Sequence, residues 1–300
     1  MRFLHRVVWL ALVLGVALNA TEPSFDELLA KAKAGDVASQ MILAGRYDNG
    51  IGVRRNPKEA FKWYERAAKA GDALAQNNIG CFYLNGEGVR QDFPKALEYF
   101  HQAAANNQKD ALCSLGLMHD NGLGVTKDPV AANDWYRKAA ELGDANAMHN
   151  LGLSYETGSG VAPDKHVAFA WFEKAAQLGH AAAQGRAGYL LYNGEGVTAD
   201  PVAALNWYRK AAAQGDVESI ANIGLAYRDG RGAQVDPVEA YAWLDVARFI
   251  TQRWQDNMQT KWGIRRELDG LRKTLSPAQV KAGEARTRIL YEKLKSGSLN

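Results

Sequence analysis

The stretch that decides the fold is GDALAQNNIGCFYLNGEGVRQDFPKALEYFHQAAAN, residues 71–106, because the chain repeats its pattern six times in one register. The last glycine of the central loop recurs every 36 residues, at Gly52, Gly88, Gly124, Gly160, Gly196 and Gly232. An aromatic residue keeps the same step, at Trp63, Tyr99, Trp135, Trp171, Trp207 and Trp243. A fixed period of about 20–50 residues indicates a stacked repeat protein, in which each unit buries its apolar face on a neighbour.

Each unit is predicted to be a pair of helices joined by a short loop. In its first half, Ala75, Ile79 and Tyr83 are four residues apart and share one face of a helix. The glycines within residues 85–88 end that helix, because they adopt left-handed backbone readily. Asp92 is an N-cap residue type and starts the second helix, whose apolar stripe includes the aromatic residue of the 36-residue step. The chain is therefore predicted to be all-α, with that aromatic row in the core.

A glycine inside the first helix is unusual, because glycine costs a helix about 1 kcal/mol relative to alanine. It nevertheless recurs in five units, at Gly80, Gly116, Gly152, Gly188 and Gly224. We expect the reason to be a close approach of the second helix, with a large aromatic side chain packed over the gap.

These features resemble Sel-one-like repeats, which are relatives of the tetratricopeptide repeats. The shared pattern is A-x-A-[QM]-x-x-[LI]-G-x-x-Y-x-x-G-x-G-V-x-x-D, followed by A-x-x-W-[YF]-x-K-A-A-x-x-G. One unit shows it well, with Ala145, Ala147, Met148, Leu151, Gly152, Tyr155, Gly158, Gly160, Val161, Asp164, Ala168, Trp171, Phe172, Lys174, Ala175 and Ala176. The resemblance covers residues 24–250. It implies a right-handed α/α superhelical solenoid of helix hairpins, used as an adaptor or scaffold.

Both ends of the repeat array are predicted to be capped. Residues 21–34 are expected to form an N-terminal capping helix, which Ser24 and Glu27 start with a capping box. Six units then fill residues 35–250. Residues 251–300 are predicted to form a C-terminal helical cap, whose last helix starts at the Ser-Pro-Ala-Gln run of residues 276–279.

The first twenty residues have the layout of a secretory signal peptide. Arg2, His5 and Arg6 precede an apolar run over residues 7–17, and Ala20 offers a small residue at the cleavage position. The run is short for a membrane span, and an uncleaved anchor is the alternative. We expect export to the periplasm or secretion, with no membrane insertion once residues 1–20 are removed.

The net charge of the chain limits the kinds of partner that it can attract. The formal charge of +3 falls to +1 without residues 1–20, which contain two arginines and no acid. Such a balance offers no basic field to nucleic acid or anionic lipid.

The chain has two cysteines, Cys81 and Cys113, 32 residues apart on the first helices of adjacent units. Export permits a disulfide between them, and two buried thiols are the alternative.

No catalytic, metal-binding or cofactor-binding pattern stands out. None of the nine serines starts a Ser-x-x-Lys motif, and G-x-S-x-G, His-Glu-x-x-His and phosphate-loop motifs are absent from the sequence. His149, His119 and Cys113 lie near one another in the repeat register but fall short of the convergent set that a metal site needs. We expect no enzyme activity, no metal and no cofactor.

In an α-solenoid the first helices line the concave surface, and positions that vary between units are candidate ligand contacts. One such row contains Asn78, Asn150, Arg186 and Asn222, and asparagine can both donate to and accept from a peptide backbone. A second row, four residues further along each helix, would add apolar pockets. Its candidate residues are Phe82, Met118 and Leu190.

The sequence therefore predicts an exported, non-enzymatic adaptor or scaffold that binds a protein or peptide on the concave face. Two alternatives remain. One is a penicillin-binding or β-lactamase-like hydrolase, as described for cysteine-rich Sel-one-like repeat proteins. The other is a structural subunit of an envelope complex.

Overall fold

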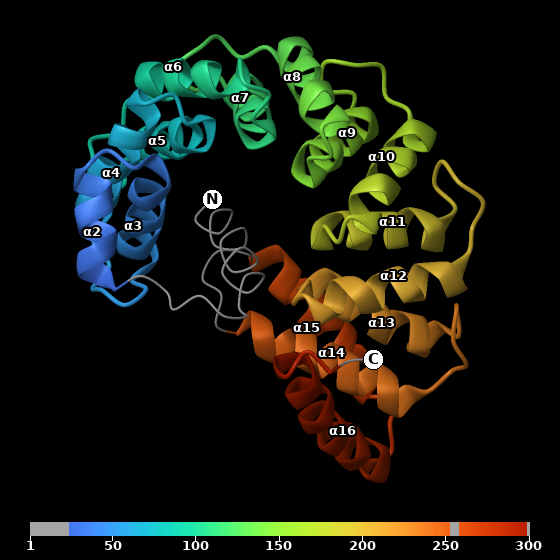
Figure 1. Cartoon of the computed structure of the whole chain (residues 1–300). Helices are drawn as coiled ribbons and strands as arrows, with labels where there is room; N and C mark the ends of the chain where they lie inside the picture. Colours follow the sequence, from blue (N-terminus) through green and yellow to red (C-terminus); the bar gives the residue numbers. More distant parts are fainter. Residues whose placement is uncertain (1–23, 253–257, 299–300) are drawn as a thin grey trace. The chain divides into compact units, whose positions relative to one another are not determined.

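The computed structural model describes residues 24–252 and 258–298, and every regular element within these ranges is an α-helix (Figure 1). The all-α prediction is thereby confirmed, whereas the predicted signal peptide lies outside the described residues. The helices are α2 Phe25–Lys33, α3 Val37–Asn49, α4 Pro57–Lys69, α5 Ala73–Asn85, α6 Phe93–Ala104, α7 Lys109–Asn121, α8 Pro129–Glu141, α9 Ala145–Thr157, α10 Lys165–Gln177, α11 Ala181–Asn193, α12 Pro201–Ala213, α13 Val217–Asp229, α14 Pro237–Thr251, α15 Met258–Arg272 and α16 Pro277–Lys295.

The chain divides into two compact units, and the boundary follows Asp128. In the first unit, α2 is followed by the hairpins α3–α4 and α5–α6 and by α7. The second unit begins with α8, continues through the hairpins α9–α10, α11–α12 and α13–α14, and ends with α15 and α16. Within every one of these hairpins the two helices pack directly against each other.

Helix ends follow the residues that the repeat pattern places there. First helices start at a capping side chain; Asp72, for example, accepts a hydrogen bond from the Ala75 N–H at 2.7 Å. They end at a glycine with left-handed backbone, such as Gly86. Second helices start at capping residues such as Asp200, which accepts from the Ala203 N–H at 2.9 Å. Asn107 replaces a closing glycine and takes the same left-handed backbone, with φ of 56°.

The recurring glycine inside the first helices leaves room for a buried side chain of the second helix. A Cβ atom on Gly152 would lie 2.6 Å from the ring of Phe172, and one on Gly188 would lie 2.8 Å from the ring of Tyr208. The expected close approach is thus present, but the side chain over the gap follows the predicted aromatic row by one residue. This core row consists of Tyr64, Phe100, Tyr136, Phe172, Tyr208 and Leu244, all fully or almost fully buried.

The predicted aromatic row is only partly a core row. Trp63 and Trp243 are buried, but Trp135, Trp171 and Trp207 are half-buried, and so is Tyr99. The half-buried indoles are covered from outside by lysines three residues later, with each ammonium nitrogen about 4.4 Å from the ring centroid, in the pairs Lys138–Trp135, Lys174–Trp171 and Lys210–Trp207. These cation–π contacts shield the outer ring faces of the second helices.

Successive hairpins touch through the loop glycines of the 36-residue step. A Cβ atom on Gly88 would lie 2.7 Å from the backbone of Pro57, and one on Gly160 would lie 2.5 Å from the backbone of Pro129. These loops therefore rest on the start of the preceding second helix. Between α10 and α11, the side-chain amide of Gln184 adds a hydrogen bond by donating to the Ala176 carbonyl at 3.1 Å.

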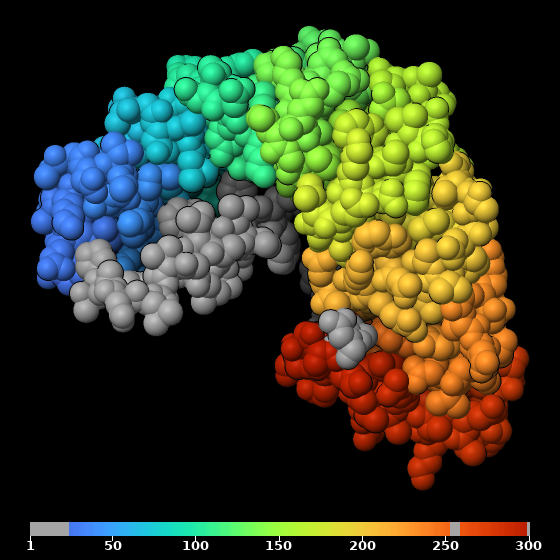
Figure 2. All heavy atoms as spheres, turned by 45° about the vertical axis from the view of Figure 1, so that its right-hand side comes forward, coloured from blue at the N-terminus to red at the C-terminus, as the bar shows by residue number. Residues whose placement is uncertain are grey.

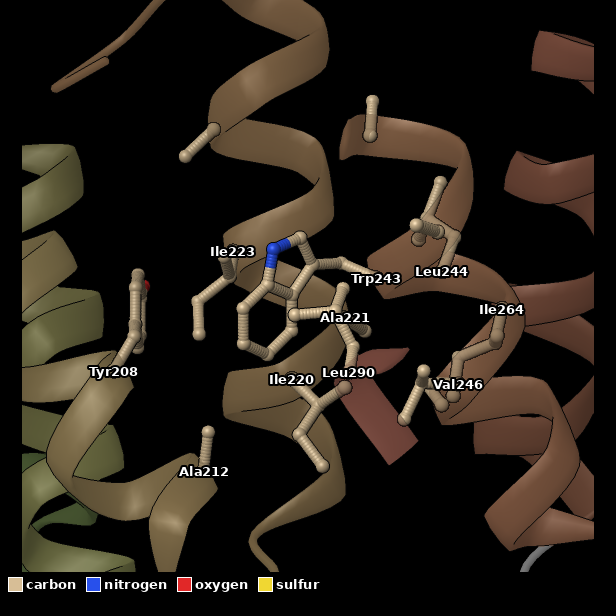
Figure 3. Packing of buried hydrophobic residues seen from close by; sticks show 14 of the residues in the cluster. Tyr208, Ala212, Ile220, Ala221, Ile223, Trp243, Leu244, Val246, Ile264 and Leu290 are labelled. Carbon is tan, nitrogen blue, oxygen red and sulfur yellow. The ribbon is translucent and has the colours of Figure 1, made fainter. Parts of the chain in front are cut away.

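The core of the second unit continues from the repeats into the C-terminal helices. In Figure 3 the indole of Trp243 lies beside Ile223 and Ala221, and the same cluster reaches Ile264 of α15 and Leu290 of α16. The capping boxes predicted for the two terminal helices are confirmed, as Ser24 with Glu27 on α2 and Ser276 with Gln279 on α16.

The two cysteines do not form a disulfide. Cys81 on α5 and Cys113 on α7 are both buried, and each remains a thiol. Burial raises the pKa of the Cys81 thiol far above its usual range, which keeps it protonated. Of the two alternatives left open by the sequence, the structure has the buried thiols.

A substitution at the helical glycine tests this packing. Gly152→Ala should lower the free energy of unfolding by roughly 1–3 kcal/mol, because the new methyl group overlaps Phe172 and overpacking outweighs the gain in helix propensity. Urea denaturation followed by circular dichroism measures the change. Gly270→Ala is the matched control, because a Cβ there meets nothing within 4 Å and alanine should stabilise α15 by roughly 0.5–1 kcal/mol. Equal effects at the two positions would contradict the packing role.

Candidate partner-binding surface

The predicted polar row divides between the two units. Asn78 lies on α5 of the first unit, whereas Asn150, Arg186 and Asn222 lie at equivalent positions of α9, α11 and α13 in the second unit. All four side chains are half-buried. The second unit thus presents three consecutive members of the row, and their role in binding remains a prediction.

The predicted apolar row is wrong as a contact surface. Met118 and Leu190 are fully buried and Phe82 is 5% exposed, so none can meet a ligand without unpacking its hairpin. Phe82 instead packs against Phe61 and Tyr64 of α4, with ring centroids 5.9 and 5.8 Å apart. A step of four residues from the polar row carries these side chains into the core, towards the second helices.

Other apolar side chains reach the surface of the first helices. They lie three residues after the polar row, which is one residue before the predicted apolar row. In the second unit these are Leu153, Tyr189 and Leu225, of which Tyr189 is 39% exposed and the two leucines are half-buried. Residues three apart are neighbours on a helix surface, so each polar residue of the row has an apolar partner beside it. The sequence analysis missed this set, although the same helical spacing predicts it.

A small pocket opens where this surface passes from α11 to α13. Its volume is about 150 Å³, and its lining comes from three helices of the second unit. The lining residues are Tyr189, Tyr192, Asn193, Tyr208, Asn222, Leu225 and Asp229. Of the predicted site residues, Asn222 lies in this pocket and Arg186 lies on the helix turn before Tyr189.

Tyrosines form the aromatic part of the pocket. The rings of Tyr192 and Tyr208 lie 6.3 Å apart between centroids, and Tyr208 is buried behind Tyr192. The hydroxyl oxygen of Tyr192 is buried and has no hydrogen-bond partner among the described residues. Burial raises the pKa of Tyr192, so the hydroxyl stays a neutral donor. An unsatisfied buried hydroxyl is the group that a bound polar atom would stabilise.

Arginines surround the pocket and neutralise the nearby carboxylates. Arg228 donates to Asp229 at 2.6 Å and to Glu267 of α15 at 2.5 Å. The guanidinium of Arg231 lies 4.2 Å from the ring centroid of Tyr192 and donates to the Tyr192 carbonyl at 2.6 Å. The pocket is therefore aromatic and amide-lined, with its one carboxylate paired.

Another arginine, Arg186, links the surfaces of α9 and α11. Arg186 forms an ion pair with Glu156 of α9, with 2.5 Å between nitrogen and oxygen. Its guanidinium carbon also lies 5.8 Å from the ring centroid of Tyr189. These contacts hold Arg186 between the two helices, beside Tyr189.

Two histidines stack between α9 and the start of α11. The rings of His149 and His180 lie 4.6 Å apart between centroids, and His180 also caps α11 by accepting from the Ala183 N–H at 3.1 Å. Burial, and then the neighbouring His180, lower the pKa of His149 to about 4. Burial likewise lowers the pKa of His180. Both rings are therefore neutral at pH 7 and act as packing groups.

In the first unit, the predicted residue Asn78 does not line the main hollow. Its side-chain nitrogen is buried without a hydrogen-bond partner among the described residues. A broader hollow of about 620 Å³ lies at the loop before α6, and Tyr83 and residues 89–95 line it. This hollow takes its walls mostly from one loop, whereas the pocket of the second unit joins three helices.

The described part of the chain has neither a metal-type cluster of side chains nor a helix of the membrane-spanning kind. Within it, no three His, Cys, Asp or Glu side chains converge as metal ligands would. Also within residues 24–252 and 258–298, no helix combines the length and apolar character that a membrane span requires.

Comparisons with known proteins identify the same 36-residue repeat. The family model described as Sel1 repeat matches six consecutive segments, residues 37–72, 73–108, 109–144, 145–180, 181–216 and 217–247. No curated protein gives a significant match to the chain.

Two solved structures are similar over most of the chain. A Sel1 repeat protein from Oxalobacter formigenes is 36% identical, with a TM-score of 0.68 over 75% of this chain and 99% of the other. The protein c5321, described as a protective antigen of uropathogenic Escherichia coli with an SLR fold, is 29% identical, with a TM-score of 0.56. That match covers 91% of this chain and 65% of c5321. Together they bear out both the family resemblance and the helical solenoid architecture.

The stacked histidines predict a pH dependence of stability. The folded-state pKa of His149, about 4, lies below its ordinary value of 6.5, so the unfolded chain takes up the proton first. This contribution is therefore full above about pH 6.5 and is lost as the pH falls towards 4. The variant His149→Asn copies Asn77, which stands at the equivalent position of α5. Its free energy of unfolding should fall by roughly 2 kcal/mol less than that of the unchanged chain as the pH is lowered.

Urea denaturation of both proteins at pH 7.5 and pH 4.5 measures this difference. The comparison with the variant removes the contribution of other titrating groups. An identical loss of stability in the two proteins would contradict the neutral, buried state of His149.

Proposed function

The chain belongs to the Sel1 repeat family, whose members are generally non-catalytic scaffolds for protein interaction, and from this premise we propose that it is an exported adaptor that binds an extended segment of a partner protein. The proposed contact surface runs along the first helices of the second unit. The observation that carries the proposal is the pocket between α11 and α13, where Asn222 of the predicted polar row meets Tyr189 and Tyr192.

The size of the pocket favours a side chain over a free small molecule. Sites for small molecules and cofactors enclose about 300–1,000 Å³. A pocket of about 150 Å³ holds one apolar or aromatic side chain. The buried Tyr192 hydroxyl and the Asn222 amide supply polar groups at its walls, so a side chain with a polar end, such as tyrosine, fits this lining best.

The polar row would hold the backbone of the same segment. Amide groups at Asn150 and Asn222, with Arg186 between them on α11, can pair with peptide carbonyl and N–H groups whatever the sequence. Leu153 and Tyr189 lie beside these polar groups and offer apolar contact area. Sequence-tolerant backbone contacts joined to one side-chain pocket are a recurring mode of peptide recognition.

Affinity purification tests the proposal. The protein would be used as bait in an extract of its native cell envelope, with bound partners identified by mass spectrometry and their affinity then measured by calorimetry. Tyr189→Ala should weaken binding by more than tenfold, because a tyrosine anchor at the centre of an interface contributes about 2 kcal/mol or more. Asn222→Ala should weaken it by about fivefold, the value of one hydrogen bond.

A matched control separates this surface from general stability. Asn206→Ala changes an exposed asparagine on the second helix α12, away from the pocket lining, and should leave affinity unchanged. Unchanged affinity for Tyr189→Ala and Asn222→Ala would reject the proposed contact surface. Labelling of the purified protein by a fluorescent β-lactam, or stoichiometric recovery in a fixed envelope complex, would favour the hydrolase or the structural subunit instead.

Export has its own test. The proposal rests here on the cationic start and apolar run of residues 1–20. Protein recovered from outside the cytoplasm should have a mass lower by residues 1–20, as measured by intact mass spectrometry. A full-length chain that stays in the cytoplasm would contradict export while leaving the binding surface untouched.

A further inference from the structure

Charge is separated within the second unit. Residues 129–258 contain 11 Lys and Arg against 15 Asp and Glu, a formal charge of −4. Residues 259–298 contain ten Lys and Arg against four Asp and Glu, a formal charge of +6. The whole-chain charge of +3 conceals this difference, so the expectation that the chain has no basic field is wrong for the C-terminal helices.

Helix α15 presents one side of this charge to solvent. Its apolar side, with Ile264, Leu268 and Leu271, is buried in the core shared with α14. Helical spacing of about 100° per residue places Trp262, Arg266, Asp269 and Lys273 on the opposite side. The indole of Trp262 is 62% exposed, which is unusual for so large an apolar group.

Helix α16 repeats the arrangement. Its buried side includes Gly283, where a Cβ would lie 2.5 Å from the ring of Tyr241, and Leu290. Its outer side carries Lys281 and Arg288, with Ile289 51% exposed beside them. Figure 2 shows the atoms of this helix, in red, at the surface of the second unit.

Both helices are tied to the repeats by ion pairs. Glu267 of α15 is bound by Arg228 of α13, and Arg286 of α16 donates to Glu239 of α14 at 2.5 Å. The exposed arginines of α15 make surface ion pairs: Arg266 donates to Glu267 at 3.2 Å, and Arg265 lies 3.7 Å from Asp269. Exposed pairs of this kind contribute little to stability, so an anionic surface can compete for these guanidinium groups.

Exposed indole and aliphatic groups among long cationic side chains match the interface of a membrane. There the indole lies among the headgroups, and each Lys or Arg attracts anionic lipid. We propose that α15 and α16 dock the second unit on the surface of a bilayer that contains anionic phospholipid, with Trp262 inserted among the headgroups. This is adsorption to the surface without a membrane span, and it is independent of the partner-binding pocket.

The charge separation also sets the orientation. An anionic surface attracts the segment of charge +6 and repels the segment of charge −4, so the unit meets the bilayer through α15 and α16. An acidic protein partner is the rival occupant. The outer faces favour lipid, because their cations are spread along two helices of about 22 and 28 Å and are interrupted by exposed Trp262 and Ile289.

Vesicle co-sedimentation of the full chain tests the proposal. Binding should be much stronger to vesicles with about one third phosphatidylglycerol in phosphatidylcholine than to phosphatidylcholine alone, and it should weaken as salt is raised. The triple variant Arg266→Gln, Lys273→Gln, Arg288→Gln should bind the anionic vesicles on the order of a hundredfold less, at about fivefold per cation. Trp262→Ser should lose about tenfold.

The control variant removes the same charge elsewhere. Lys33→Gln, Lys58→Gln, Lys127→Gln changes three exposed lysines of the first unit and should bind like the unchanged chain. Circular dichroism confirms that each variant is folded, and residues 1–20 are common to all of them. The proposal is overturned if anionic lipid brings no gain in binding, or if the triple variant and its control bind equally.

Discussion

The tightest hairpin contacts in this protein depend on two kinds of position that have no room for a Cβ atom, one inside the first helix and one in the loop. Within a hairpin, Gly152 and its equivalents let an aromatic ring of the second helix reach the backbone of the first. Between hairpins, Gly88 and Gly160 let a loop rest on the start of the preceding second helix. An extra residue in a unit would shift both contacts at once, so the 36-residue step is kept without insertion. The stack is thereby specified by short-range sterics, with hydrophobic burial supplying the driving force.

That constraint also explains which residues are left for binding. Core positions recur because the same gap must be filled in every unit, as with Phe172 and Tyr208. Half-buried positions of the first helices do not fill that gap and are therefore not held to one residue type. Asn150 and Arg186 differ at one such position, and Leu153 and Tyr189 differ at another. A solenoid can thus change its ligand without changing its fold.

The repeat step predicted the fold class, the helix caps and the close approach at the helical glycines from sequence alone. It did not predict which side of a helix each row lies on. The repeat period gives the spacing of residues along the chain, but it does not give the rotation of each helix about its own axis relative to the core. Leu190 was therefore assigned to the surface and is buried, while Tyr189, one residue and about 100° away, is exposed. The same uncertainty of one residue separates the half-buried Trp171 from the core ring of Phe172. The pocket could not be predicted either, since it needs three helices at once.

The last turn of the repeats links the two surfaces of the second unit. Arg228 pairs with Asp229, which lines the pocket, and with Glu267, which lies on α15. Because the guanidinium is shared, the pocket contains no uncompensated carboxylate, and an uncharged side chain can enter without burying an unpaired charge. Glu267 also accepts from Arg266 at 3.2 Å, so this carboxylate connects α13 with the cationic side of α15. The pocket and the C-terminal helices therefore share one network of charges around Arg228 and Glu267.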